Sequence, residues 1–236
     1  MRREVLSAIL DQRKAKRPVA VVTLICSGRQ ALISADGSLL AGDEGLYGDD
    51  VSTAVEAALA EDRSHNLETA EGLVFVQALN PPLRMAIVGA VHITQALAPM
   101  AALLGYEVTV IDPRRAFASS ERFPAVQVLG EWPDEALKGL RPDRRTAVVT
   151  LTHDPKLDDP ALAVALDSEA FYIASLGSRR THAARIERLK QAGFKDATIA
   201  RIHGPAGLAI KARSPAEIAT AILAQATQAL RGGAAG

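Results

Sequence analysis

The chain has 236 residues, and its 27 Lys and Arg residues balance 27 Asp and Glu residues, so its formal net charge is zero at pH 7. A balanced charge gives no overall attraction to nucleic acid or to an anionic membrane, and we expect neither as a partner. The one cysteine, Cys26, excludes an intrachain disulfide and a metal site with several cysteine ligands. The N-terminus is charged and lacks an apolar segment, and no stretch is apolar enough to span a bilayer, so we expect a cytoplasmic protein.

Residues 1–80 combine short apolar runs with turn signals, which predicts a small α+β domain. Asp36-Gly37 favours a tight hairpin turn between two strands. Asp49 or Ser52 has the side chain to cap a second helix. The paired prolines of Asn80-Pro81-Pro82 favour a linker at the end of the domain. The expected elements are a helix over 3–17 and strands over 19–25, 31–34, 38–41 and 73–79.

Residues 81–231 alternate between strand and helix patterns, which predicts an α/β, Rossmann-like domain with a parallel sheet flanked by helices. Ser214-Pro215-Ala216-Glu217 has the pattern of a capping box at the start of the last helix. Residues 232–236 are expected to form a disordered tail. The expected strands are 84–88, 107–111, 126–129, 146–151 and 171–176, and the expected helices lie near 92–104, 133–140, 158–167, 179–191 and 215–230.

The turn after the first of these strands departs from the dinucleotide-binding pattern G-x-G-x-x-G. Its three glycine positions hold Gly89, Val91 and Thr94, so only the first is kept. We expect the branched Val91 side chain to occupy space that a pyrophosphate would need. Asp112 ends the next strand, where Rossmann proteins hold a ribose hydroxyl, and it is equally well placed to cap the turn at Pro113.

Ligands of open parallel sheets bind beyond the carboxyl ends of the strands, so the residues that follow each strand are candidate binding residues. Four of the five histidines are among the residues expected there, and they form either one shared site or separate structural contacts. The candidate residues for cofactor binding are Gly89, His92, Asp112, Arg114, His153, Asp154, Gly177, Ser178, Arg179, Arg180, Thr181, His203 and Gly204.

The segment LGSRRTH is the most informative of these stretches. Ser178 is placed to cap a helix whose first two residues are Arg179 and Arg180. Cations are unfavourable there because the helix dipole is already positive, so we favour a site that a phosphate or carboxylate completes. The alternative is that both arginines extend into solvent or pair with acids such as Asp154.

Several stretches resemble the XdhC/CoxI family, the accessory proteins of xanthine-dehydrogenase-type molybdenum enzymes. These are THDPKLDDPAL at 152–162, FYIASLGSRRTHAARIERL at 171–189 and ARIHGPAGLAIKARSPAEIATAIL at 200–223, with IVGAVHITQALA at 87–98 and VTVIDPR at 108–114. The resemblance implies a small N-terminal domain followed by a Rossmann domain. It also implies a chaperone, rather than an enzyme, that binds the molybdenum–pterin cofactor as cargo and hands it to an apo molybdenum hydroxylase, alongside other cofactor-maturation proteins.

The N-terminal domain departs from the family pattern. The family's arginine–glycine–serine–serine–proline loop and Gly-Gly-Cys turn correspond here to CSGRQAL at 26–32 and YGDDVSTAV at 47–55. The family's cysteine position falls on Asp50, which leaves a thiolate contact to molybdenum without its cysteine. The family's Gly-Ala-Gly-His-Ile turn has Val91 in place of its second glycine.

Two other functions remain open from the sequence. The first is an NAD(P)-dependent oxidoreductase that holds ribose with Asp112 and uses one of the four histidines as acid–base. The second is a degenerate family member that acts only as a docking partner for the molybdenum enzyme or another accessory protein. A homodimer is a further arrangement that the sequence leaves open.

Overall fold

The computed structural model describes the whole chain except residues 1, 115–116, 118–121, 125 and 233–236. It divides into two compact units, Met1–Pro81 and Pro82–Gly236. The expected disordered tail falls on residues 233–236, which lie outside the described residues, whereas Gly232 is the last residue of helix α8 (Pro215–Gly232). None of the described helices is long and apolar enough to cross a membrane.

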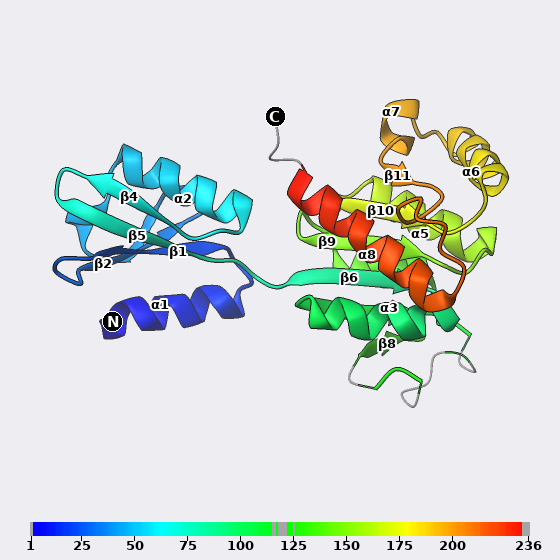
Figure 1. The fold of residues 1–236 in the computed structure, drawn as a ribbon, viewed down its shortest axis with the longest axis horizontal. Coiled ribbons are helices and arrows are strands. Elements are labelled where there is room, and N and C mark those ends of the chain that lie inside the picture. The colour runs from blue at the N-terminus through cyan, green and yellow to red at the C-terminus, as the bar shows by residue number, and fades with distance from the viewer. Residues whose placement is uncertain (1, 115–116, 118–121, 125, 233–236) are drawn as a thin grey trace. The chain divides into compact units, whose positions relative to one another are not determined.

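The first unit is an antiparallel sheet with one helix on each face (Figure 1). Helix α2 (Asp49–Glu61) covers the face that carries Ala20 and Val22, and helix α1 (Arg3–Lys14) covers the face that carries Val21. The strand order is β3-β2-β1-β5-β4, with β1 (Val19–Leu24), β2 (Gln30–Ser34), β3 (Leu39–Gly42), β4 (His65–Thr69) and β5 (Gly72–Leu79). Strand β4 and a short 3-10 helix, η1 (Glu44–Leu46), were not predicted.

The prediction of a side-chain cap for α2 is wrong. Gly48 is the N-cap residue of α2, and among the described residues no side chain makes a capping hydrogen bond at the start of this helix. Asp49 and Ser52 both lie inside the helix. Asp49 and Asp50 occupy the first turn, where their negative charges offset the positive end of the helix dipole.

The second unit confirms the predicted Rossmann-type fold. Its sheet has the order β11-β10-β9-β6-β7-β8, and each neighbouring pair is parallel. The order reverses between the neighbours β6 and β9, the position at which such sheets open for ligands. The strands are β6 (Leu83–Val88), β7 (Tyr106–Ile111), β8 (Gln127–Leu129), β9 (Thr146–Thr150), β10 (Tyr172–Ser175) and β11 (Ile202–His203), of which β11 was not predicted.

Helices cover both faces of this sheet, so its strands carry apolar residues on both faces. Met85 and Ile87 of β6 pack with helices α3 (His92–Leu103) and α8. Ala86 and Val88 face the other way and pack with α4 (Pro133–Leu140), α5 (Pro155–Leu166) and α6 (Arg179–Gln191). The short helix α7 (Asp196–Ile199) was not predicted.

Two helix starts show how local sequence sets the element bounds. The predicted capping box is confirmed at α8, where Glu217 accepts hydrogen bonds from the amides of Arg213 and Ser214 at 2.7 and 2.9 Å. Helix α5, in contrast, begins at Pro155 and not at 158 as predicted. Asp154 caps it by accepting from the amide of Lys156, and proline suits the first helical position because its missing N–H is not needed there.

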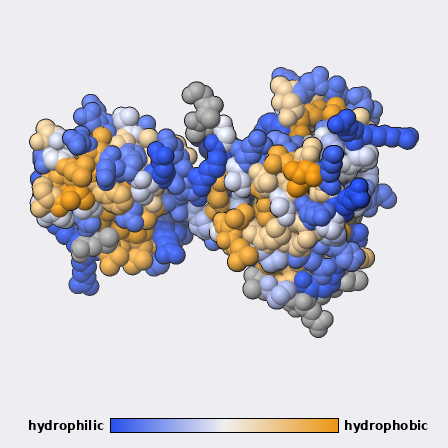
Figure 2. Space-filling view, viewed as in Figure 1, coloured by the Kyte–Doolittle hydropathy of each residue, from blue (hydrophilic) through white to orange (hydrophobic). Residues whose placement is uncertain are grey.

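The surface mixes apolar and polar side chains. On the face shown in Figure 2, hydrophobic residues are interspersed with hydrophilic ones on both units. Leu103 and Leu104 at the end of α3 are 88% and 56% exposed. Single exposed leucines of this kind are ordinary on a folded protein and do not mark a function.

Candidate functional site

The candidate residues follow strands β6, β7, β9, β10 and β11 of the second unit. Since these strands are parallel, their carboxyl ends meet at one edge of the sheet, which we call the carboxyl edge. The loops at this edge lie on both sides of the point between β6 and β9 where the strand order reverses.

Gly89 begins the turn after β6 and packs tightly against the loop after β9. Its φ is +110°, a conformation that favours glycine, and an added Cβ would lie 2.8 Å from Cγ2 of Thr152. At the third glycine position of the dinucleotide pattern, the buried Thr94 donates its hydroxyl hydrogen bond to the carbonyl of Gly89. Val91 is the N-cap residue of α3, and its side chain packs against the apolar core. The turn is therefore held by contacts within the protein.

Asp112 is fully buried, and both of its carboxylate oxygens are already bonded. Oδ2 accepts from the amide of Ala90 at 2.8 Å and from Arg114 Nη2 at 2.8 Å, and Oδ1 accepts from Nε and the amide of Arg114 at 2.9 and 3.0 Å. Burial acts to raise the pKa of Asp112, but the hydrogen bonds from Arg114 and Ala90 outweigh it and lower the pKa. Of the two roles left open by the sequence, this geometry favours the structural one.

The start of α6 has the predicted cap. Ser178 Oγ accepts a hydrogen bond from the amide of Thr181 at 3.1 Å. Gly177 has φ of +146°, and an added Cβ would lie 3.1 Å from Cβ of Thr181, so the loop is compact. Arg179 and Arg180 are exposed, and within the described part of the chain neither side chain makes a hydrogen bond or ion pair. The predicted alternative partner, Asp154, caps α5 instead.

The histidines at the carboxyl edge have different surroundings. His92 and His153 are exposed, and His153 has φ of +62°. His203 is half-buried with its ring centroid 5.0 Å from that of Tyr172, and burial lowers the pKa of His203. His182 packs against Gly204 so closely that an added Cβ there would overlap the ring. No hydrogen bond joins two of these histidines among the described residues.

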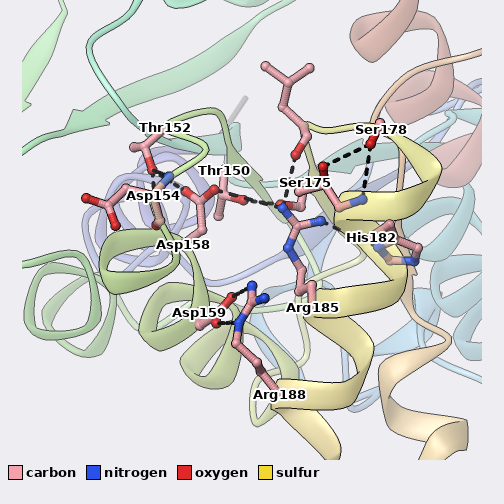
Figure 3. A network of polar contacts seen from close by, with 12 residues as sticks. Thr150, Thr152, Asp154, Asp158, Asp159, Ser175, Ser178, His182, Arg185 and Arg188 are labelled. Carbon is pink, nitrogen blue, oxygen red and sulfur yellow. Dashed lines mark hydrogen bonds and ion pairs between the residues drawn. The ribbon is translucent and has the colours of Figure 1, made fainter.

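A buried polar network links the loops after β9 and β10, as Figure 3 shows. Asp158 of α5 and Arg185 of α6 are 1% and 2% exposed. Asp158 Oδ1 accepts from the hydroxyl of Thr152 at 2.7 Å, and Arg185 Nη2 donates to the carbonyl of Leu176 at 3.0 Å. Arg185 Nη2 lies 4.0 Å from Asp158 Oδ2. We call these two residues the Asp158–Arg185 pair.

Further hydroxyl and imidazole groups belong to this network. The hydroxyls of Thr150 and Ser175, at the ends of β9 and β10, lie 2.6 Å apart, and His182 Nδ1 lies 3.5 Å from Arg185 Nη1. Burial raises the pKa of Asp158 and lowers the pKa of Arg185. Burial, and then the charge of Arg185, lower the pKa of His182.

Asp158 and Arg185 are not among the site residues predicted from the sequence. A signal for them was present, because each occupies a position on the apolar stripe of its helix. Asp158 lies one turn before Leu162, and Arg185 lies one turn before Leu189, and both leucines are in the core. A charge on such a stripe is buried and needs a partner.

Arg114 interacts with acidic side chains from two loops of the carboxyl edge. The hydrogen bonds that Arg114 donates to Asp112 raise the pKa of Arg114, and the charges of Asp154 and Asp158 add to this effect. The fold therefore brings Arg114, after β7, close enough to interact with acidic residues that follow β9. No group of three or more His, Cys, Asp or Glu side chains within the described residues is arranged to hold a metal ion.

The first unit has a cavity of its own, of about 420 Å³, at the start of α2. Asp50, which takes the place of the family's cysteine in the resemblance, is among the lining residues, together with Tyr47 and Glu71. Cys26 is exposed and is not one of the residues that line this cavity.

Comparisons with known proteins agree with this architecture. The family model described as the XdhC Rossmann domain matches residues 85–226, more than half of the chain. The chain is 32% identical over 159 residues to the uncharacterized protein YqeB of Escherichia coli strain K12, covering 66% of this chain and 29% of YqeB. It is 30% identical over 151 residues to the molybdenum cofactor insertion chaperone PaoD of the same strain, covering 64% of this chain and 41% of PaoD.

Two further matches carry the term xanthine dehydrogenase in their names. A protein of Bacillus subtilis strain 168, named as a probable xanthine dehydrogenase subunit, is 31% identical over 156 residues, covering 66% of this chain and 45% of that protein. A crystal structure described as a xanthine dehydrogenase from Bacillus halodurans superposes with a TM-score of 0.72 at 26% identity, covering 96% of this chain and 64% of that one. The chain spans less than half the length of the curated relatives it matches. By the family match over its Rossmann domain, the chain belongs to the XdhC family.

Proposed function

We propose that this chain is an accessory protein that binds the molybdenum–pterin cofactor at the carboxyl edge and assists its insertion into a molybdenum hydroxylase of the xanthine dehydrogenase type. The cofactor is cargo in this proposal, and the chain holds and releases it without chemical turnover. The names of two relatives, an insertion chaperone for the molybdenum cofactor and a probable xanthine dehydrogenase subunit, support this assignment.

The observation that carries the proposal is the pair of cations at the start of α6, which have no hydrogen-bond or ion-pair partner among the described residues. Arg179 and Arg180 are exposed at the positive end of a 13-residue helix, where cations are unfavourable without an anion. The phosphate of the pterin would supply that anion. The side chains of Arg179 and Arg180 would donate charge-assisted hydrogen bonds to it, and the backbone amides of the same two residues would add further donors.

The donor set at the carboxyl edge fits a polar, anionic cargo. The hydroxyls of Ser178 and Thr181, 2.9 Å apart, lie at the start of α6 next to the two arginines in the chain. His153 and Asp154 are exposed on the loop after β9 and would bond to polar groups of the pterin.

The same geometry argues against a bound nicotinamide dinucleotide. A ribose would have to displace Arg114 from both oxygens of Asp112. The amide of Ala90, in the turn that would approach the pyrophosphate, already donates to Asp112. No observation therefore favours the oxidoreductase, and we do not propose it as a second function.

The test is binding of purified molybdenum–pterin cofactor to the full chain, measured as pterin retained after ultrafiltration. The variant Arg179→Ala/Arg180→Ala should bind more than a hundredfold more weakly, since each charge-assisted hydrogen bond contributes about 1.5–3 kcal/mol. The control is Arg144→Ala/Arg145→Ala, an adjacent pair before β9 at the opposite edge of the sheet, which should bind as the wild type does.

The outcomes separate the competing functions. Equal affinity in the wild type and in Arg179→Ala/Arg180→Ala would reject this site. A wild-type chain that retains no pterin, yet associates tightly with an apo molybdenum hydroxylase, would select the docking-only function. Delivery is tested by adding the loaded chain to the apo-hydroxylase and measuring the pterin transferred.

A further inference from the structure

We propose that Asp158 and Arg185 are positioning residues that hold the loops after β9 and β10 in one fixed arrangement. These loops carry His153 and Asp154 on one side and Gly177 to Thr181 on the other. This role rests on the proposed function. Asp158 and Arg185 are buried and are not binding residues themselves, but they would set the distance between the two halves of the ligand site.

Each member of the pair is bonded to a different loop. Asp158 Oδ1 accepts from Thr152 Oγ1 at 2.7 Å, and the same hydroxyl oxygen accepts from the amide of Asp154 at 3.0 Å. Arg185 Nη2 donates to the carbonyl of Leu176 at 3.0 Å, directly before Gly177. The loops therefore meet through the pair, although they come from strands separated in sequence by helix α5 (Figure 3).

The geometry of the Asp158–Arg185 pair is not optimal for stabilising the folded chain. The shortest approach of Asp158 Oδ2 to the guanidinium is 4.0 Å, beyond hydrogen-bond range, and both Oδ2 and Arg185 Nε lack hydrogen-bond partners within the described residues. A buried ion pair with unsatisfied atoms contributes little net stability compared with apolar residues of similar size. Its contribution is then to structural specificity: it selects one relative placement of the two loops.

The contact with Thr152 extends this arrangement to a third loop. The methyl group of Thr152 lies under Gly89, where an added Cβ would be 2.8 Å away. Asp158 fixes the hydroxyl of the same side chain. A shift of Asp158 would therefore change the contact between Thr152 and the turn at Gly89, as well as the loop that carries His153.

The test measures amide hydrogen exchange in the free full-length chain. The amide of Asp154, bonded to Thr152 Oγ1, reports on the first loop, and the amide of Thr181, bonded to Ser178 Oγ, reports on the second. Arg185→Gln should speed exchange of the Asp154 amide at least fivefold, although within the described residues no hydrogen bond joins Arg185 to that loop. Asp158→Asn should speed exchange of the Thr181 amide by a similar factor.

A matched control exists between the same two helices. Arg188 and Asp159 form a more exposed ion pair, with Nη2 and Oδ1 3.0 Å apart, and no hydrogen bond joins either to the two loops within the described residues. Arg188→Gln should leave both reporter amides unchanged. If Arg188→Gln speeds both to the same extent, or if each substitution in the pair affects only its own loop, the positioning role is wrong. Should Arg185→Gln fail to fold, Asp158→Asn, which keeps the side-chain shape, decides the question alone.

Ligand affinity provides the second readout and rests on the proposed function. Asp158→Asn and Arg185→Gln should weaken binding of the molybdenum–pterin cofactor at least tenfold, and Arg188→Gln should not. If the wild type binds no pterin, the proposed function fails while the exchange experiment still decides the positioning role. If exchange changes across the loops but affinity does not, the pair does not position the ligand site, and the inference is overturned.

Discussion

Gly204 lies so close to the imidazole of His182 that a side chain at position 204 has no room. The contact joins the loop after β11 to helix α6, one turn before Arg185, whose Nη1 lies 3.5 Å from His182 Nδ1. Three loops of the carboxyl edge thus converge on α6, and the side chains that hold them together are mostly buried.

Gly204→Ala should destabilise the folded chain. The added methyl would overlap the His182 ring, and overpacking of this kind costs about 1–3 kcal/mol. Urea unfolding measures the change, and His182→Ala in the same chain should recover part of it by removing the ring. Gly139→Ala is the matched control, since it lies inside α4 with no described atom within 4 Å of the added Cβ, and it should stabilise the chain by about 0.5–1 kcal/mol. Equal effects of the two substitutions would contradict this explanation.

Asp112→Asn should destabilise the second unit in a pH-dependent way. The amide cannot replace the carboxylate in all four hydrogen bonds, and leaving buried donors unpaired costs about 1–3 kcal/mol. Because folding lowers the pKa of Asp112, the carboxylate stabilises the chain fully above its unfolded pKa of about 3.9. This stabilisation is lost as the pH falls through the lower folded value.

The measurement for Asp112 is the free energy of unfolding of both chains as a function of pH. The difference between wild type and Asp112→Asn should be constant between about pH 5 and 7 and should shrink below about pH 4. A difference that stays the same down to about pH 2 would mean that the ionised carboxylate does not contribute.

Neither oxidised nor reduced nicotinamide dinucleotides should raise the melting temperature of the chain. A ligand present at a hundred times its Kd would stabilise the native state by about 2.7 kcal/mol, which a thermal-shift measurement detects. Asp112, Arg114 and Ala90 already satisfy one another where the ribose would bind. A clear rise in the melting temperature with either dinucleotide would show that Arg114 can leave Asp112. It would then favour the NAD(P)-dependent oxidoreductase function.

The sequence predicted most of the fold because the periodic signals were strong. Strands such as 84–88 and 107–111 are continuous β-branched or apolar runs, and the structure places β6 and β7 within one residue of them. Strand β4 was missed because HNLET is a polar edge strand with no fully buried residue. Strand β11 has two residues, too few for any pattern. The early start of α5 was signalled by Asp154-Pro155, a capping residue followed by a proline at the first helical position.

The site was only partly predictable for a related reason. The cap at Ser178 and the turn at Gly89 are local features, so the sequence around them is sufficient. The bonds of Asp112 to Ala90 and of Asp158 to Thr152 depend on which loops meet at the carboxyl edge. Such contacts follow from strand order, which local patterns do not determine.

Two substitutions of Ser178 distinguish its role as the cap of α6 from the proposed anion site next to it. Asn and Asp cap helices about as well as Ser, so Ser178→Asn and Ser178→Asp should both keep the bond to the Thr181 amide and the melting temperature. Asp also places a negative charge at the positive end of the helix dipole, which is favourable for folding. That charge would lie beside Arg179 and Arg180 and repel a phosphate.

Ser178→Asp should therefore weaken binding of the molybdenum–pterin cofactor at least tenfold, whereas Ser178→Asn should bind within about threefold of the wild type, since only the aspartate competes with the ligand for the arginines. Ultrafiltration gives the affinities, and thermal unfolding of the same samples shows that both variants are folded. Raising the salt concentration should reduce the difference between the two variants, because the repulsion acts between exposed charges. Equal affinities for Ser178→Asp and Ser178→Asn at low salt would mean that no anion is bound next to Arg179 and Arg180.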